Sequence, residues 1–275
     1  MPRLSIFHHP LLYYKNKYYH HKLKYGKASP GLSIVDIHGV HFPCDLSLGK
    51  MTRSMYFGAY DFEIRRMIEK VLRKGDVFVD VGANVGYFSA VGAACVGTGG
   101  QVHCFEPIPW LFDYLGKFRD LNPGYRIFVN PLAGGDKNET STIYQSKNTG
   151  GHSLLAGYSA SDNQQKTYCI EVCRLDEYIY KKSIIKIALI KIDTEGYEFP
   201  VLLGLTRFFE KHRGYLPVLV IEVSRRGFSL TGHTIQEFED FMQTFGYVAY
   251  EICGCHRADL HRTEDQNLVF IPEKA

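Results

Sequence analysis

One stretch of the chain decides the fold: Val-Phe-Val-Asp-Val-Gly-Ala-Asn-Val-Gly-Tyr-Phe-Ser at residues 77–89. Its apolar residues flank Asp80 and predict a buried parallel strand, and the glycines that follow predict a tight turn that opens a helix. Gly82 lets the backbone bend, Gly86 lets the helix pack closely on the strand, and the free amides at the helix start favour polar or anionic groups. This order of elements predicts a nucleotide-binding corner.

The spacing of the glycines narrows the kind of ligand. A dinucleotide fingerprint would need glycines where Asn84 and Tyr87 stand, and the Gly-Lys-Ser/Thr of a P-loop is absent. The pattern that fits is the acid-x-Gly-x-x-x-Gly of S-adenosylmethionine-dependent methyltransferases. A second strand, 101–105, then ends in Glu106, whose carboxylate can accept hydrogen bonds from both ribose hydroxyls.

Several blocks in this order resemble FkbM-type methyltransferases. They are Asp-Val-Gly-Ala-Asn-Val-Gly-Tyr-Phe-Ser at 80–89, Phe-Glu-Pro-Ile-Pro at 105–109, Cys-Arg-Leu-Asp-Glu-Tyr at 173–178, Lys-Ile-Asp-Thr-Glu-Gly-Tyr-Glu at 191–198 and Ile-Glu-Val at 221–223. The resemblance implies a class I methyltransferase fold, S-adenosylmethionine as cofactor and O-methylation, often of sugars or natural products. It does not fix the acceptor.

Alternating strand and helix patterns predict an α/β fold, a Rossmann-like three-layer sandwich with a mostly parallel seven-stranded sheet. We expect strands near 76–81, 101–105, 126–132, 187–192, 216–222, 247–252 and 266–271, and helices over 85–95, 109–121, 197–212 and 234–245. The last two strands have no helix between them, which predicts a C-terminal antiparallel hairpin. The polar stretch 134–167 predicts a substrate loop, followed by an added strand from Tyr168 to Val172.

We expect two parts in the chain: a basic, aromatic extension over 1–30 and a single methyltransferase domain over 31–275. Within the domain, 31–74 is expected to form a hairpin-rich layer and a helix capped by Asp61, and 75–275 the Rossmann-like core. In class I methyltransferases such a helix helps to roof the cofactor, which makes Tyr60 and Glu63 candidate neighbours of it.

Bulk properties set further limits. The 275 residues carry a net charge of +3, and no acidic residue precedes Asp36, so the positive charge belongs to the N-terminal extension. The basic extension could form a helix that packs on the domain with its lysines solvated, and this is the alternative that we favour. Residues 1–27 could instead make peripheral contact with a membrane. Nucleic acid is the least favoured partner. The seven cysteines form no complete zinc pattern and no apolar run is long enough to span a bilayer, so we expect a cytoplasmic, reduced environment.

The expected cofactor contacts follow from the turn, the strand ends and the resemblance. They are Asp80, Gly82, Asn84, Gly86, Tyr87, Glu106, Pro107, Leu132 and Asp193. Two alternatives stay open: Asp80 either binds the cofactor or satisfies the turn amides, and Asn84 either binds the methionine carboxylate or braces the loop.

The expected catalytic residues are Asp193, Glu195 and His152, because methyl transfer to an alcohol needs a base that removes one proton. His233 is a further candidate. Asp193 and Glu222 end neighbouring strands, and catechol-type methyltransferases resemble this arrangement, which suggests Mg²⁺ or another divalent cation. Glu222-Val223-Ser224 replaces the Asp-Asn pair of those enzymes, and this departure counts against metal dependence.

The polar loop favours a sugar as the acceptor. Its hydroxyl and amide side chains, with Tyr144 and Tyr158, suit a hydrogen-bonding ring better than an apolar polyketide. We therefore expect O-methylation of a carbohydrate or glycosylated product. A small natural-product alcohol is the alternative, followed by a non-catalytic binding module that uses the basic arm.

Overall fold

The structure is a computed structural model that describes residues 31–146, 151–158, 166–254 and 256–273. Its centre is a seven-stranded sheet with the order β11-β12-β10-β9-β3-β4-β5. The strands are β3 (Val77–Val81), β4 (Gln101–Phe105), β5 (Ile127–Asn130), β9 (Leu189–Ile192), β10 (Val218–Val223), β11 (Tyr247–Glu251) and β12 (Gln266–Pro272). β12 pairs antiparallel with both β10 and β11, whereas the pairs from β10 to β5 are parallel. The predicted C-terminal hairpin is confirmed.

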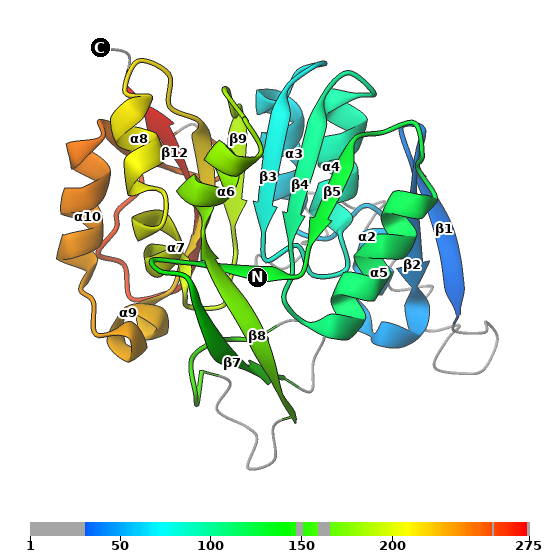
Figure 1. Ribbon diagram of the computed structural model, residues 1–275, viewed down its shortest axis with the longest axis horizontal. Helices are drawn as coiled ribbons and strands as arrows, with labels where there is room; N and C mark the ends of the chain where they lie inside the picture. Colours follow the sequence, from blue (N-terminus) through cyan, green and yellow to red (C-terminus); the bar gives the residue numbers. More distant parts are fainter. Residues whose placement is uncertain (1–30, 147–150, 159–165, 255, 274–275) are drawn as a thin grey trace.

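Helices cover both faces of this sheet (Figure 1). They are α3 (Phe62–Val71), α4 (Tyr87–Val96) and α5 (Pro109–Asp120) on one face, and α6 (Leu175–Lys181), α7 (Glu198–Leu203), α8 (Thr206–Lys211) and α10 (Ile235–Thr244) on the other. Because side chains alternate along a strand, Phe78 packs in the first core and Val79 in the second. The predicted three-layer α/β sandwich is confirmed.

Two predicted elements have other boundaries. The single helix expected over 197–212 is divided into α7 and α8, because the Leu205 amide bonds to Leu202, three residues back, and the turn tightens there. The strand expected over 126–132 ends at Asn130, since Pro131 has no N–H to donate to the ladder.

The stretch 134–167, expected to be a loop, contains strand β7 and the adjoining ends of two other strands, which corrects the prediction in part. A second sheet with the order β6-β8-β7 is built from β6 (Leu132–Gly135), β7 (Glu139–Gln145) and β8 (Lys166–Arg174), and β8 contains the added strand that the sequence predicts. In Figure 1 the β7–β8 pair extends beyond the central sheet at the end where β3, β4 and β5 terminate. Residues 147–150 and 159–165 lie outside the described residues.

The segment before α3 also differs from expectation. β1 (Leu32–Ile37) and β2 (Val40–Asp45) form the predicted hairpin, but the chain then enters a one-turn 3-10 helix (Leu46–Leu48) and α2 (Lys50–Tyr56). Asp61 stands at the start of α3 without a side-chain capping bond, because its backbone is left-handed, with φ of 34°. The basic extension at 1–30 lies outside the described residues, and within the described ranges no helix is long and apolar enough to cross a bilayer.

Candidate active site

The order of the strands places a cavity at the centre of the sheet. The chain runs outward from β3 through β4 to β5 and then returns to β9 on the other side of β3. In open α/β sheets such a reversal leaves a crevice beyond the carboxyl ends of the two central strands, where ligands bind. A cavity of about 80 Å³, open to solvent, lies there.

The glycine turn forms the floor of this cavity. The Gly82 and Ala83 amides both donate to the Phe105 carbonyl at 3.0 Å, which ties the turn to β4. A Cβ at Gly82 would collide with the Asp193 carbonyl, and its φ of +76° also favours glycine. Asn84 Oδ1 accepts from the Val85 amide at 2.8 Å, so this side chain braces the loop. The turn amides that the sequence suggested for anion binding are therefore largely engaged within the protein.

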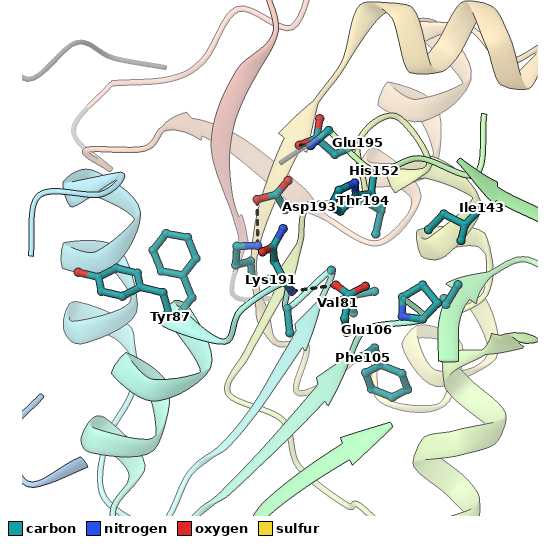
Figure 2. Close-up of a pocket in the computed structure, with 18 of the residues that line it drawn as sticks. Val81, Tyr87, Phe105, Glu106, Ile143, His152, Lys191, Asp193, Thr194 and Glu195 are labelled. Atoms are coloured by element: carbon teal, nitrogen blue, oxygen red, sulfur yellow. Dashed lines mark hydrogen bonds and ion pairs between the residues drawn. The ribbon is translucent and has the colours of Figure 1, made fainter. Parts of the chain in front are cut away.

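Glu106 joins the glycine turn to the start of α5. Its Oε2 accepts from the Asn84 amide at 2.9 Å and its Oε1 from the Ile108 amide at 3.0 Å. Burial raises the pKa of Glu106 to about 7, although both amides oppose that rise. The carboxyl group is fixed at the cavity wall with its remaining lone pairs oriented by two backbone bonds (Figure 2).

A buried lysine connects the two central strands. Lys191 is 2% exposed, and its Nζ lies 3.0 Å from Asp193 Oδ2 and 3.7 Å from Asp80 Oδ1. The longer contact is a Coulombic one, since 3.7 Å is too long for a hydrogen bond, and Asp80 Oδ2 accepts from the Ser89 hydroxyl at 2.6 Å. Burial lowers the pKa of Lys191, but Asp193 and Asp80 outweigh burial and hold that pKa above its ordinary value. The lysine is an ammonium ion that faces the cavity.

Three carboxylates meet at the acidic end of the cavity. Oxygen atoms of Asp193, Glu195 and Glu222 all lie within 4.8 Å of one another. Burial and then the nearby Asp193 raise the pKa of Glu195 to about 8 and that of Glu222 to about 10. Carboxylates this close cannot all carry a charge without a cation, so the cluster either holds protons or holds a metal ion.

The turn after β9 is strained and internally braced. Glu195 has φ of 55° and Gly196 has φ of 100°. Glu198 Oε1 accepts from the Thr194 and Gly196 amides, both at 2.9 Å, so this carboxylate stabilises the turn. Non-glycine residues in the left-handed region cluster at functional sites, where the surrounding bonds fix them.

Residues 151–158, here called the insertion loop, cover this turn. The Gly151 amide donates to Glu195 Oε1 at 2.9 Å, and the Ser153 hydroxyl donates to the Glu195 carbonyl at 2.6 Å. Farther along, the Tyr158 and Ser224 hydroxyls are 2.9 Å apart. His152 lies between the two residues that bond to Glu195, and it lines the cavity.

Most of the predicted site residues border the cavity, and some do not. Those that line it are Gly82, Asn84, Tyr87, Glu106, Pro107, Leu132, His152, Asp193 and Glu195. Asp80 is fully buried below the floor, beside Lys191, and Gly86 starts α4 behind the turn. Glu222 does not line the cavity, but one of its oxygens lies within 4.8 Å of Asp193 and Glu195. His233 pairs with Glu237 and packs on Phe199, away from the cavity.

Tyr87 borders the cavity with its ring and not with its hydroxyl group. The hydroxyl accepts a bond of 3.4 Å from Arg65 of α3, and in Figure 2 it points away from the carboxylates. Tyr60 lines the same side of the cavity, whereas its companion candidate Glu63 does not border it.

Sequence reasoning missed several residues that line the cavity. They are Lys191, Thr194, Phe88, Leu154, Met51 and Met55. The sequence could have indicated Lys191, because a lysine inside the apolar strand Leu-Ile-Lys-Ile must have a buried partner. No sequence pattern indicated the two methionines, since their approach to the cavity depends on the packing of α2 against β2.

The comparison with protein families agrees with this geometry. The methyltransferase FkbM domain matches residues 80–249, more than half of the chain, and its limits include the end of β3, the whole of β9 and the insertion between them. The chain belongs to the FkbM methyltransferase family. The order of its central sheet, with the antiparallel β12, is that of a class I methyltransferase.

Individual relatives of this FkbM-family chain match over part of their length. The hexuronic acid methyltransferase AglP of Haloferax volcanii is 28% identical over 145 residues, which cover 52% of this chain and 56% of AglP. The crystal structure of methyltransferase FkbM from Methylobacillus flagellatus KT is 18% identical, with a TM-score of 0.46, over 81% of this chain and 54% of that one. Aeropyrum pernix fibrillarin, solved with bound S-adenosyl-L-methionine, is 10% identical, with a TM-score of 0.39, over 73% and 67%. The match therefore spans about half of the curated relative's length.

Proposed function

We propose that this chain is an S-adenosylmethionine-dependent O-methyltransferase that acts on a hydroxyl group of a carbohydrate. The observation that carries the proposal is the cavity itself, where Glu106 and the glycine turn border one end and Asp193 and Glu195 border the other. A nucleoside cofactor and a hydroxyl acceptor can meet between these two ends.

The cavity residues suit the cofactor in their chemistry. Glu106 would accept from the ribose hydroxyls, and Pro107 with Leu132 would contact the adenine. The sulfonium is a cation, which carboxylates and the faces of aromatic rings such as Phe88 stabilise. When bound, S-adenosylmethionine supplies an electrophilic methyl group.

The chain's own residues would orient the acceptor and remove its proton. Glu195 faces the cavity, and its pKa of about 8 suits a general base near neutral pH. Lys191 holds Asp193 at 3.0 Å and so fixes the second carboxylate beside it. We assign Glu195 as the base and Asp193 as the residue that positions the acceptor hydroxyl.

A sugar is the acceptor that the surroundings favour. The outer part of the site comes from the β7–β8 pair and the insertion loop, and hydroxyl and amide side chains predominate in β7, Glu-Thr-Ser-Thr-Ile-Tyr-Gln. AglP, whose name describes a hexuronic acid methyltransferase, supports the same class of substrate. A small natural-product alcohol is the alternative acceptor.

A second version of the proposal adds a divalent cation to the site. Asp193, Glu195 and Glu222 offer hard oxygen ligands within 4.8 Å of one another, which suits Mg²⁺ or Mn²⁺. Such an ion would replace the protons that the cluster otherwise holds and would orient a substrate hydroxyl. A shift in the melting temperature of the cofactor-free protein with Mg²⁺, absent in Glu222→Gln, would support it; no shift would exclude it.

The function is tested with labelled S-adenosylmethionine and a glycan extract of the source cell. The full chain should transfer label to glycan, and mass spectrometry should locate the methyl group on an oxygen. Label in protein or RNA alone would contradict the sugar assignment. Activity after exhaustive chelation would remove the metal from the mechanism. No transfer to any acceptor would favour the non-catalytic binding module.

Peripheral membrane contact through residues 1–27 and a cytoplasmic location remain proposals from the sequence. The segment lies outside the described residues, so its basic and aromatic character is the support for this idea. Co-sedimentation of the full chain with anionic vesicles, compared with a variant carrying Lys22→Glu and Lys24→Glu, tests it. Equal binding by both chains would argue against it.

A further inference from the structure

His152 is held in one orientation and one tautomer. The ring is 9% exposed, and its Nδ1 lies 3.0 Å from the backbone nitrogen of Ser146. A backbone amide is a donor, so Nδ1 must accept and the proton of the neutral ring is assigned to Nε2. Burial lowers the pKa of His152 to about 4, which keeps the ring neutral at pH 7. His152 therefore presents an N–H group, and it has no free lone pair with which to act as a base.

This N–H has no protein acceptor. His152 Nε2 is buried and has no hydrogen-bond partner among the described residues. The ring meets the edge of Trp110, with centroids 6.4 Å apart, and Trp110 Nε1 is likewise buried and unpartnered within the described ranges. An unsatisfied buried donor destabilises a fold, so a group of this kind is retained where a ligand supplies the acceptor.

The position of the ring indicates which part of a ligand this is. His152 borders the cavity together with Pro107, Leu132 and Ile143, which are apolar and suit the faces of a flat ring. In Figure 2 His152 and Ile143 lie on the side of the cavity opposite Tyr87. A sugar hydroxyl would need an acceptor as well as a donor, whereas a purine ring nitrogen needs a donor alone.

We infer that His152 Nε2 donates a hydrogen bond to a ring nitrogen of the cofactor's adenine. His152 is then a specificity-determining residue for the purine, and the insertion loop helps to close over the cofactor. Two bonds from its neighbours to Glu195 fix the loop, so recognition of the base and the position of the carboxylate are coupled. This inference rests on the proposed function, because it assumes that the nucleoside occupies this cavity.

The experiment is a titration of the full chain with S-adenosylhomocysteine and its 1-deaza, 3-deaza and 7-deaza adenine analogues. In the wild type, one analogue should bind about tenfold more weakly than the parent, since the hydrogen-bond acceptor is replaced by C–H. His152→Phe should bind S-adenosylhomocysteine about tenfold more weakly than the wild type does. This variant should bind the same deaza analogue as tightly as it binds S-adenosylhomocysteine, because the hydrogen bond is already absent. His152→Gln, whose amide keeps a donor, should recover part of the affinity.

Controls separate this inference from the proposed function. His41→Phe changes a histidine on β2 that does not border the cavity and should behave as the wild type. Thermal melting establishes that each variant folds, and His152→Phe should raise the KM for S-adenosylmethionine more than it lowers kcat. The inference would be overturned if His152→Phe bound S-adenosylhomocysteine as tightly as the wild type, or if it still bound the deaza analogue more weakly than S-adenosylhomocysteine. Either result would leave the proposed function intact. Failure of the wild type to bind S-adenosylhomocysteine would overturn both.

Discussion

Replacing Lys191 with methionine should destabilise the chain in a pH-dependent way. Methionine keeps the length and shape of the side chain but removes the ammonium that lies 3.0 Å from Asp193 and 3.7 Å from Asp80. Asp80 is 0% exposed, so water cannot replace the lost cation. Its carboxylate must then stay charged in an apolar core or take up a proton.

The expected magnitude follows from the burial of each partner. Removing one member of a buried ion pair costs about 3–5 kcal/mol, because the other charge stays desolvated. The Asp193 side chain is 26% exposed and gains some relief from water. We therefore take the lower end of that range, a loss of about 3 kcal/mol from the free energy of unfolding at pH 7.

The sign of the pH dependence is set by Asp80. Burial already raises its pKa and Lys191 opposes that rise, so the substitution should raise the folded-state pKa further. A carboxyl group whose folded-state pKa exceeds its unfolded value of about 3.9 favours folding below 3.9, and this contribution is lost as the pH rises through the folded-state pKa. Lys191→Met should therefore be least stable, relative to the wild type, at alkaline pH.

Urea unfolding of four chains at pH 5 and pH 8 measures this effect. They are the wild type, Lys191→Met, Asp80→Asn and the double variant. Asparagine carries no charge and can still accept from Ser89, so the double variant should recover about 2 kcal/mol relative to Lys191→Met. An equal loss at both pH values, together with strictly additive single losses, would refute the reasoning.

Three further changes test the site. Glu106→Ala should weaken binding of S-adenosylhomocysteine by about 1–3 kcal/mol, and an unchanged titration would remove the ribose contact. Gly82→Ala should lower the melting temperature because its Cβ collides with the backbone of Asp193, whereas Gly116→Ala, with nothing within 4 Å, should not; equal melting would contradict this. The methylation rate should rise with pH toward about 8, the pKa of Glu195, as its carboxyl group ionises. In Glu195→Gln the methylation rate should no longer rise with pH over this range. If the rate still rises, the base is another group.

Local spacing was enough to predict the position of the glycine turn and of Glu106, which border one end of the cavity. Gly82, Gly86 and Glu106 depend on one strand, one turn and the next strand, so their relation is nearly fixed by the chain itself. The chain between Asp80 and Glu106 has few ways to form a parallel strand–helix–strand unit. The crossover connection in such a unit is right-handed in nearly all proteins. The sequence therefore carries most of this geometry.

The acidic half depends on contacts between distant segments, and the prediction there was less complete. The sequence suggested Asp193 and Glu222 as a pair, but the position of Glu195 depends on a left-handed turn, with φ of 55°, that no local pattern indicated. Lys191 was quoted within a family block and was not recognised as a buried cation. Its role emerges when β9 pairs with β3 and brings it beside Asp80.

The insertion was the least predictable part. The hydroxyl and amide residues of the insertion predicted a loop, yet all of β7 pairs with β8, from Glu139 opposite Val172 to Gln145 opposite Lys166. Polar residues are common in strands with solvent on one face, so polarity alone does not exclude a strand. His152, predicted as a base, accepts at Nδ1 from the Ser146 amide, a contact that no sequence pattern revealed.

The reversal of strand order also determines where members of this family can diverge. Between β5 at the edge and β9 at the centre the chain must cross the sheet, and it builds β6, β7 and β8 during that crossing. Insertions or deletions at the β7–β8 end would change the wall of the cavity that Ile143 borders, yet they would leave the β3–β4 and β3–β9 ladders intact. This segment can therefore vary in length and sequence without disturbing the sheet, and protein engineers can reshape that wall at the same place.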